Sequence, residues 1–580
     1  MRRTGDFCGR LIRIGAIVVW YTIPPVSSAE ERPALPSAPS MHLDPRLDGQ
    51  VEFSGLVYDL RDQTVHSLPK RLAVDPETAR IEGEMGAEWA DVQQRMDYAW
   101  VGAQRENYPY RTAVRICTKQ PSGGYCIGSG VMISPIHVLT AGHVAAPGVG
   151  CTGAAFPSGI DVWPALWDGL DIATGNHEPE PFEESPFGKS QGIFLHVPTP
   201  WLNQGDSRFD IAVVTLDRPI GALTGWVGRL FEGNDYLSGL VCRSNDFFTT
   251  TSFTMNSFPG GYNQMRSWSG TFDYLGPWIS FDQGFFAYFL HSNPPEHAIG
   301  GESGSGIFSY VNGTPFASSI LIAHTGGGLA DAFCYVSGDI HNVALRIDQA
   351  KFDFISASIA LPAAFDAVPL NVRVGEMTLP KLGPSSACFP TGQPSFLDVK
   401  ARQPLPPISM WIANRSSASW SGLVPYEVYL SCDASIDPND PDDVLLDQGV
   451  AAVSVGGLAS EHVVLPSQPL LPCVAGANSA DFYLGVHLLL SDGDVSNNST
   501  SGWDAMPLRL TNSADCNCKY AKFEVHIDLD DHAQLVQCML GPDVVSTGAE
   551  CQAADLNGDS HVDIFDYSLF LGCFGAVGCQ

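Results

Sequence analysis

The chain has 580 residues, of which 44% are hydrophobic and 16% charged, and its formal net charge is −32. This composition predicts folded domains of about 150 residues each rather than a disordered chain, and the 58 glycines and 42 prolines favour turn-rich β structure. The negative charge argues against nucleic-acid binding, because phosphates require a basic surface, and it disfavours anionic membranes.

The N-terminus has the features of an export leader. Four arginines among the first 13 residues precede a mostly apolar stretch, residues 14–26, which is too short to span a bilayer. Small residues at 27–29 predict cleavage after Ala29, so residues 1–29 are interpreted as a signal peptide, with an uncleaved anchor as the alternative. We therefore expect a secreted or cell-surface protein that has no membrane span after leader removal.

The cysteines agree with export. The chain has 15 of them, and loss of Cys8 with the leader leaves an even number. No pair has the spacing of a metal site, so disulfides are the expected use. Cys117 and Cys126 flank a Gly-Gly turn and are predicted to staple a hairpin, whereas the other pairings stay open.

The chain divides by texture into an N-terminal segment and a long β-rich region. Residues 30–104 carry no catalytic motif. The segment is interpreted either as a pro-segment or as an extension that packs on the next domain. Residues 105–360 contain short apolar runs separated by Gly and Pro, which predict a β-barrel domain closed by one helix. The predicted strands are 112–117, 130–134, 137–140, 211–216 and 319–323, and the predicted helix is 342–358.

Three further segments follow. The Pro-rich residues 361–404 are interpreted as a linker. Residues 405–512 are again strand-like, for example at 426–430 and 482–490, and predict a β-sandwich. Residues 515–580 form a tail rich in Cys and Asp. The whole chain is thus expected to be mainly β.

A nucleophile, a base and an orienting acid are found in the 105–360 region. His143 follows a β run directly, Ser303 lies in Gly300-Gly-Glu-Ser-Gly-Ser-Gly306, and Asp210 opens an apolar strand. Acyl transfer needs these three groups together. The glycines beside Ser303 allow a tight turn, which can aim the N–H groups of Gly301 and Ser303 at one point as an oxyanion hole.

The order of the three residues distinguishes this design from other hydrolases. The order His, Asp, Ser differs from the Ser, Asp, His and Asp, His, Ser orders of two other hydrolase designs. Asp171 is a rival acid, but it follows His143 too closely to have crossed a barrel. His143, Asp210 and Ser303 are therefore the predicted catalytic triad.

The three motifs resemble those of chymotrypsin-like (trypsin-like) serine peptidases. They read Thr-Ala-Gly-His143, Asp210-Ile-Ala-Val-Val and Gly301-Glu-Ser303-Gly-Ser-Gly. Segments 127–133, 257–270 and 323–327 are more narrowly similar to the bacterial glutamyl-endopeptidase branch. The resemblance covers about residues 105–360. It implies a double β-barrel with the triad in the cleft, and hydrolysis of protein or peptide substrates without a catalytic cofactor.

The resemblance also implies roles for residues around the cleft. His324 stands where the branch places a histidine that meets an acidic substrate side chain, and Ala298 lies at a substrate-binding position before the nucleophile. A preference for Glu or Asp on the acyl side follows as an expectation. Glu302 is the acid type that pairs with a freed N-terminus in animal members, and a solvated loop acid is the alternative. The first possibility predicts a mature enzyme that lacks part of residues 30–105.

The tail contains a calcium-type loop, because alternate oxygen-bearing residues can converge on one hard cation. The predicted side-chain ligands are Asp555, Asn557, Asp559, Asp563 and Asp566, with the carbonyl of His561. The pattern resembles a dockerin type I repeat, which implies a small helical, EF-hand-like unit and a possible docking partner. Residues 528–531 resemble the end of a degenerate second loop.

Residues 405–512 are similar to Ig-like, CARDB-type domains of bacterial surface proteins. The residues that carry this resemblance are 429–440 and 492–498. Two functions are therefore weighed. The first is a secreted serine endopeptidase with accessory modules, and the second is a surface adhesion protein whose peptidase-like domain is inactive. The intact triad favours the first.

Overall fold

The computed structural model describes most of the chain from residue 55 onward. The described residues are 55–68, 78–81, 99–121, 123–147, 156–167, 170–171, 176–177, 185–232, 251–259, 265–272, 274–276, 286–289, 298, 300–325, 341–359, 361–362, 364–375, 396–466, 468–474, 479–512, 529–539, 551, 554, 556 and 561–573. The predicted leader lies outside them. No helix in this part of the chain is long and apolar enough to cross a membrane.

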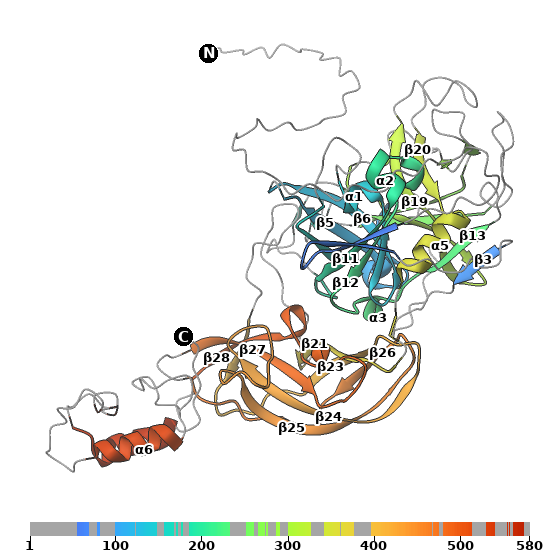
Figure 1. The fold of residues 1–580 in the computed structure, drawn as a ribbon. Helices are drawn as coiled ribbons and strands as arrows, with labels where there is room; N and C mark the ends of the chain where they lie inside the picture. Colours follow the sequence, from blue (N-terminus) through green and yellow to red (C-terminus); the bar gives the residue numbers. More distant parts are fainter. Residues whose placement is uncertain are drawn as a thin grey trace, which may run out of the picture.

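The described residues form two β units and a helical tail (Figure 1). The first unit contains a closed six-stranded barrel in the order β12-β7-β6-β5-β8-β11, because β12 also pairs with β11. Its strands are β5 (Ala113–Lys119), β6 (Tyr125–Ser134), β7 (His137–Thr140), β8 (Gly159–Pro164), β11 (Ser190–Pro198) and β12 (Ala212–Leu216). Their apolar side chains fill one core, as the predicted strands required. The mainly β fold is confirmed.

The N-terminal segment is built into this unit. Strand β1 (Gly55–Asp59) pairs with β11 and with β2 (Thr64–Ser67), and Tyr58 and Leu60 are buried in the barrel core. Strand β3 (Thr78–Ile81) pairs with β13 (Gly228–Glu232), and β4 (Ala99–Trp100) pairs with β15 (Arg266–Gly270). The described strands of this segment therefore pack on the next domain, which both a pro-segment and an extension can do.

A second, larger sheet forms a half-barrel beside the first, and it is not closed in the described residues. Its path is β16-β17-β20-β19-β18-β14-β15-β4, with β13 paired to β19. The strands not yet introduced are β14 (Phe253–Ser257), β16 (Tyr274–Gly276), β17 (Phe286–Phe289), β18 (Gly306–Val311), β19 (Thr314–Thr325) and β20 (His341–Arg346). Short strands β9 (Leu170–Asp171) and β10 (Asn176–His177) pair separately.

The predicted closing helix is shorter than expected. Helix α5 spans Gln349–Ser358, whereas residues 342–346 belong to β20. This strand pairs with both β17 and β19, and Val343, Ala344 and Leu345 are fully buried. Burial on both faces of a sheet gives a continuous apolar run, which sequence periodicity does not distinguish from a buried helix.

The predicted hairpin disulfide is wrong. Cys117 and Cys126 lie on the neighbouring strands β5 and β6, and they are not bonded to each other. The register pairs Cys117 with Ile127 and Thr118 with Cys126. Since directly opposite residues share a face and successive residues alternate, the two thiols lie on opposite faces of the sheet. Burial raises the pKa of Cys126 to about 11.

The second β unit contains two sheets around one core. One sheet has the order β21-β23-β26, and the other β22-β28-β27-β24-β25. The strands are β21 (Ala367–Val374), β22 (Leu397–Lys400), β23 (Ile408–Asn414), β24 (Trp420–Ser431), β25 (Val444–Val455), β26 (Ser460–Val464), β27 (Ser479–Leu488) and β28 (Met506–Thr511). Strands β21 and β22 fall in the predicted linker, so part of that segment is folded into this unit.

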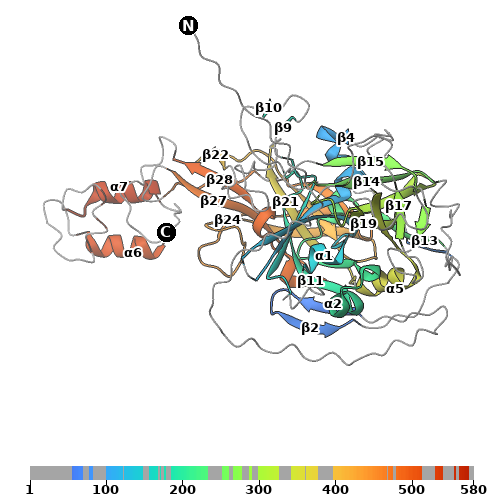
Figure 2. The ribbon, with the colours of Figure 1, turned by 90° about the horizontal axis from the view of Figure 1, so that it is seen from above.

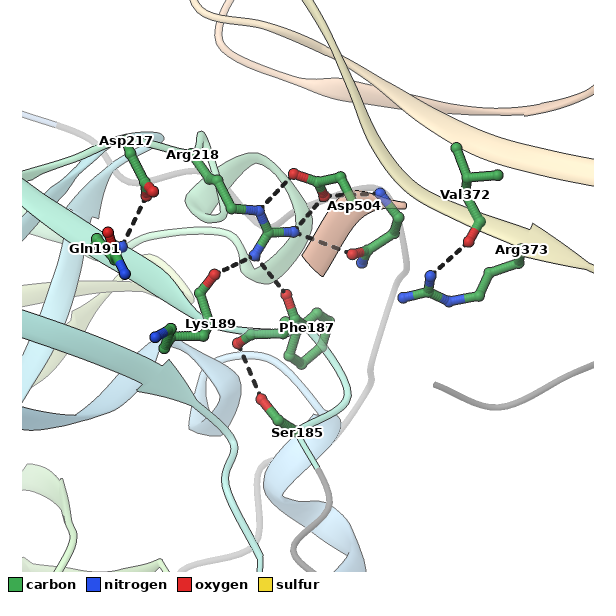
Figure 3. A network of polar contacts seen from close by, with 11 residues as sticks. Ser185, Phe187, Lys189, Gln191, Asp217, Arg218, Val372, Arg373 and Asp504 are labelled. Atoms are coloured by element: carbon green, nitrogen blue, oxygen red, sulfur yellow. Dashed lines mark hydrogen bonds and ion pairs between the residues drawn. The ribbon is translucent and has the colours of Figure 1, made fainter. Parts of the chain in front are cut away.

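The two β units are packed against each other beside α3 (Gly221–Thr224) (Figure 1). A buried apolar cluster joins Ala222 and Leu223 to Val368 and Leu370. Figure 3 shows Arg218 of the first unit bound to Asp504 of the second. Nε of Arg218 donates to Oδ2 of Asp504 at 2.6 Å, and its Nη2 donates to Oδ1 of Asp504. The same Nη2 also donates to Oδ1 of Asn371. Both charged side chains are less than 10% exposed. The units therefore form one packed body.

The tail has two helices, α6 (Leu529–Cys538) and α7 (Ile564–Cys573), which lie side by side (Figure 2). His532 of α6 contacts Tyr567 of α7. A disulfide joins Cys538 to Cys551, and Cys432 and Cys473 each take part in a disulfide. Disulfides are thus present, as the cysteine count predicted.

Candidate active site

Asp210 and His143 form the best-defined polar contact of the candidate site. Strand β7 ends at Thr140, and the single turn α1 (Gly142–Ala145) carries His143 away from the barrel. Its ring Nδ1 lies 2.7 Å from Oδ2 of Asp210, and its backbone N–H donates to Oδ1 at 2.7 Å. Both carboxylate oxygens of Asp210 therefore bind His143, which fixes the orientation of the imidazole ring. The other ring nitrogen, Nε2, is not used in this contact.

The surroundings of this pair set the basicity of the ring. Burial alone would lower the pKa of His143, but the charge of the Asp210 carboxylate and its hydrogen bond outweigh burial, so that the pKa is raised above its ordinary value. The Asp210 side chain is 7% exposed and that of His143 is 33% exposed, so the imidazole remains reachable from solvent. A ring oriented in this way can act as a general base.

Trp201 is a neighbour of the site that no sequence motif indicated. It lies in α2 (Thr199–Gln204), and its ring meets that of His143 edge to face, with centroids 6.5 Å apart. The Trp201 side chain is buried. It therefore covers one side of the imidazole with an apolar surface and limits how the ring can turn.

The serine loop is held against the end of the barrel that carries His143. The N–H of Ser129 donates to the carbonyl of Ser303 at 2.8 Å. Gly304 has φ +90°, and a Cβ there would lie 2.2 Å from both the carbonyl oxygen of Ser129 and Oγ1 of Thr140. Only glycine fits this approach. Ser303 is thus placed beside the strand end that leads into His143.

The same turn shapes the backbone around the hydroxyl. Gly301 has φ +96°, and its carbonyl accepts from Oγ of Ser129 at 2.9 Å. Among the described residues, the N–H groups of Gly301 and Ser303 donate to no acceptor, whereas the N–H of Gly304 donates to Leu321. Two uncommitted N–H groups beside a half-buried serine are what an oxyanion hole requires.

Glu302, the acid that the resemblance pairs with a freed N-terminus, is bound in this structure by a cation of the same β unit. Its side chain is fully buried and is bound by Arg266, whose Nε and Nη2 donate to the two carboxylate oxygens at 3.0 and 2.7 Å. Oγ of Ser257 donates to the same carboxylate at 2.7 Å. A buried carboxylate requires a cation, and the chain supplies one from β15. The solvated alternative is excluded.

The two predicted specificity positions lie close in the fold. Ala298 is buried, and its N–H donates to Oδ1 of Asn342 at 2.9 Å. In the sheet register Asn342 is the direct partner of His324. The backbone of His324 therefore lies in β19 near Ala298, while its side chain is outside the described residues.

The predicted calcium ligands are described in part. Asp555, Asn557 and Asp559 lie outside the described residues. Asp566 is fully buried, and its two oxygens accept from the N–H groups of Leu556 and Asp563 at 2.7 and 2.8 Å. These bonds draw the two ends of the loop together, which fits a loop whose oxygen donors converge. Among the described residues no group of three acidic or His/Cys side chains could hold a metal.

No family model matches the chain, and no curated protein matches it. Solved structures similar to it include a Glu endopeptidase in complex with MPD, at 18% identity and TM-score 0.31, with 46% of this chain and 99% of that one covered. Protease Anisep from Arthrobacter nicotinovorans is 17% identical, with 43% and 96% covered and TM-score 0.31. The thermostable serine protease AL20 is 14% identical, with 43% and 98% covered and TM-score 0.29.

Proposed function

We propose that this chain is a serine endopeptidase in which His143, Asp210 and Ser303 form the catalytic triad. The observation that carries the proposal is the double anchoring of His143 by Asp210, with Nδ1 and the backbone N–H each 2.7 Å from one carboxylate oxygen. The packing of Gly304 against Thr140 supports it, because that contact brings the serine loop to the same strand end. The test is whether the chain cleaves a protein substrate, and whether that cleavage depends on Ser303.

The proposed reaction uses the chain's own residues throughout. Oγ of Ser303 attacks the carbonyl carbon of the peptide bond, and Nε2 of His143 accepts the hydroxyl proton. The N–H groups of Gly301 and Ser303 stabilise the oxyanion that forms. His143 then gives the proton to the leaving amine, leaving an acyl-enzyme. Water, activated by the same ring, hydrolyses the ester and restores Ser303. Asp210 keeps the ring in the required tautomer and stabilises its charged form.

We further propose that the protein acts outside the cell. The leader-like residues 1–29 and the disulfide-bonded cysteines support this, since disulfides persist in oxidising compartments.

We propose a preference for Glu or Asp on the acyl side, with His324 of β19 as the residue that meets the substrate carboxylate. A protonated His324 would donate to the substrate carboxylate. We expect His324→Ala to lower kcat/KM for acidic substrates about tenfold or more, relative to neutral ones, because a hydrogen bond to a charged group is lost. The matched control is His66→Ala, at an exposed histidine in β2. A peptide-library profile dominated by Arg, Lys or aromatic residues refutes the preference, and an acidic preference unchanged in His324→Ala refutes that residue's role.

The loop 555–566 is proposed to bind one calcium ion as part of a dockerin-like tail. When bound, the ion would hold the loop and helix α7 together; it takes no part in hydrolysis. We expect calorimetry on the whole chain to show one site, which Asp559→Ala removes, and chelation to leave the peptidase activity unchanged. Absence of calcium uptake at millimolar concentrations would overturn the assignment.

A further inference from the structure

The two N–H groups of the proposed oxyanion hole belong to a turn with glycine on both sides of the nucleophile. Gly301 has φ +96° and Gly304 has φ +90°. Glycine restricts backbone rotation less than any other residue, so the peptide groups of this turn need other contacts to keep their orientation. A donor that rotates away from the oxyanion no longer stabilises it.

The hydroxyl of Ser305 fixes the direction of one of the two donors. The carbonyl of Glu302 accepts from Oγ of Ser305 at 2.6 Å and from its N–H at 3.1 Å. The peptide bond between Glu302 and Ser303 is trans, so its N–H points opposite to its carbonyl. Ser305 is fully buried, which shields these contacts from solvent. By holding the carbonyl, Ser305 aims the N–H of Ser303 away from itself.

Ser305 is itself bonded to strand β19. The N–H of Leu321 donates to the carbonyl of Ser305 at 2.9 Å, and the N–H of Gly304 donates to the carbonyl of Leu321 at 2.7 Å. A hydroxyl whose backbone is bonded to a strand is a rigid support for its neighbour. The half-barrel therefore supports the peptide group between Glu302 and Ser303.

Ser129 holds the preceding peptide group from the other half of the unit. It lies in β6 of the barrel and is fully buried. Its Oγ accepts from the N–H of Phe258 at 2.8 Å, which leaves the hydroxyl proton for the carbonyl of Gly301, 2.9 Å away. This bond leaves φ as the single backbone rotation by which the N–H of Gly301 could turn. Two consecutive peptide groups are thus held by one hydroxyl from each half.

Building on the function proposed above, we propose that Ser129 and Ser305 are positioning residues of the oxyanion hole. Their hydroxyls hold two consecutive carbonyls and so keep both N–H donors aimed at one point. The backbone bonds from Ser129 to Ser303 and from Gly304 to Leu321 involve neither hydroxyl and keep the turn in place without them. The hydroxyls therefore act where negative charge develops on the substrate oxygen, and not on binding of the intact peptide.

The first test compares kcat and KM in the whole chain. Ser305→Ala removes the hydroxyl contact and keeps the N–H contact to Glu302. We expect kcat to fall about tenfold, which is less than the ~10²–10³-fold cost of losing a whole donor, and KM to stay within about twofold. Ser318→Ala is the matched control and should leave kcat within about twofold. Ser318 is fully buried in β19, and its Oγ has no hydrogen-bond partner within the described part of the chain.

A peptidyl trifluoromethyl ketone gives a readout that a merely structural role would not change. Oγ of Ser303 adds to its carbonyl carbon, the hydroxyl proton passes to His143, and the carbonyl oxygen becomes an oxyanion. We expect Ki in Ser305→Ala to rise by the same factor as kcat/KM falls. The Kd of an uncleaved substrate peptide, measured in a Ser303→Ala background, should be the same with and without Ser305→Ala.

Ser129→Ala is expected to give the same pattern and provides the test if Ser305→Ala does not fold. Unchanged kcat and Ki in the folded variants, or a higher KM at unchanged kcat, would overturn the positioning role and leave the triad in place. Wild-type cleavage that Ser303→Ala does not abolish would instead refute the proposed function, and the positioning role with it.

Discussion

Replacing Ser303 by alanine is expected to lower kcat/KM for peptide hydrolysis by about 10⁴-fold or more and to leave folding intact. The variant removes the atom that would attack the carbonyl, while the backbone bond from Ser129 to Ser303 and the Gly304 contact remain available. The measurement is a continuous assay on a quenched fluorescent peptide, with circular dichroism to verify the fold.

Ser309→Ala is the matched control. Ser309 is fully buried, and its Oγ has no hydrogen-bond partner within the described part of the chain. Its replacement should leave turnover within about twofold, since no interaction is lost. Unchanged turnover in Ser303→Ala would refute the proposed triad. It would mean that the loop around Ser303 does not supply the nucleophile.

Arg266→Met is expected to destabilise the first β unit by roughly 3–5 kcal/mol, because the fully buried Glu302 would lose its cation. In a domain of this size that loss lowers the melting temperature by roughly 10 °C. Since Glu302 directly precedes Ser303, we also expect kcat/KM to fall, by about 10²-fold, as the loop shifts. Calorimetry and the peptide assay measure the two effects.

Two further variants distinguish loss of the ion pair from loss of the arginine side chain as such. Adding Glu302→Gln to Arg266→Met neutralises the stranded carboxylate and should recover part of the lost stability. Arg509→Met breaks an exposed pair with Asp481 and should change little. If Arg266→Met were as stable and as active as wild type, the buried pair would not be what positions the nucleophile loop.

The residues of the proposed triad could be selected from the sequence because their local signals were strong. His143 follows a strand that the structure places at His137–Thr140, as predicted, and the spacing along the chain favoured Asp210 over Asp171. The structure joins His143 to Asp210. Glycines beside Ser303 predicted a tight turn, and Gly301 and Gly304 have the positive φ angles that such a turn needs.

The partners of those residues could not be predicted, because they depend on sheet register and on contacts distant in sequence. Nothing near Glu302 indicates that Arg266, on another strand, supplies its counter-charge. The offset of one residue between Cys117 and Cys126 turns an apparent disulfide into two thiols on opposite faces. Residues 361–404 were interpreted as a linker because they are rich in proline, so β21 was not predicted. This strand pairs with β23, which is distant in the sequence.

The central claim is that Ser303 is an activated nucleophile, and labelling by a serine-directed phosphonate tests it most directly. After incubation of the purified chain with the reagent, mass spectrometry of its peptides should find one adduct, on Ser303. The adduct should be absent from Ser303→Ala and strongly reduced in His143→Ala, which lacks the base. Labelling of another residue, or equal labelling of Ser303 without His143, would contradict the triad.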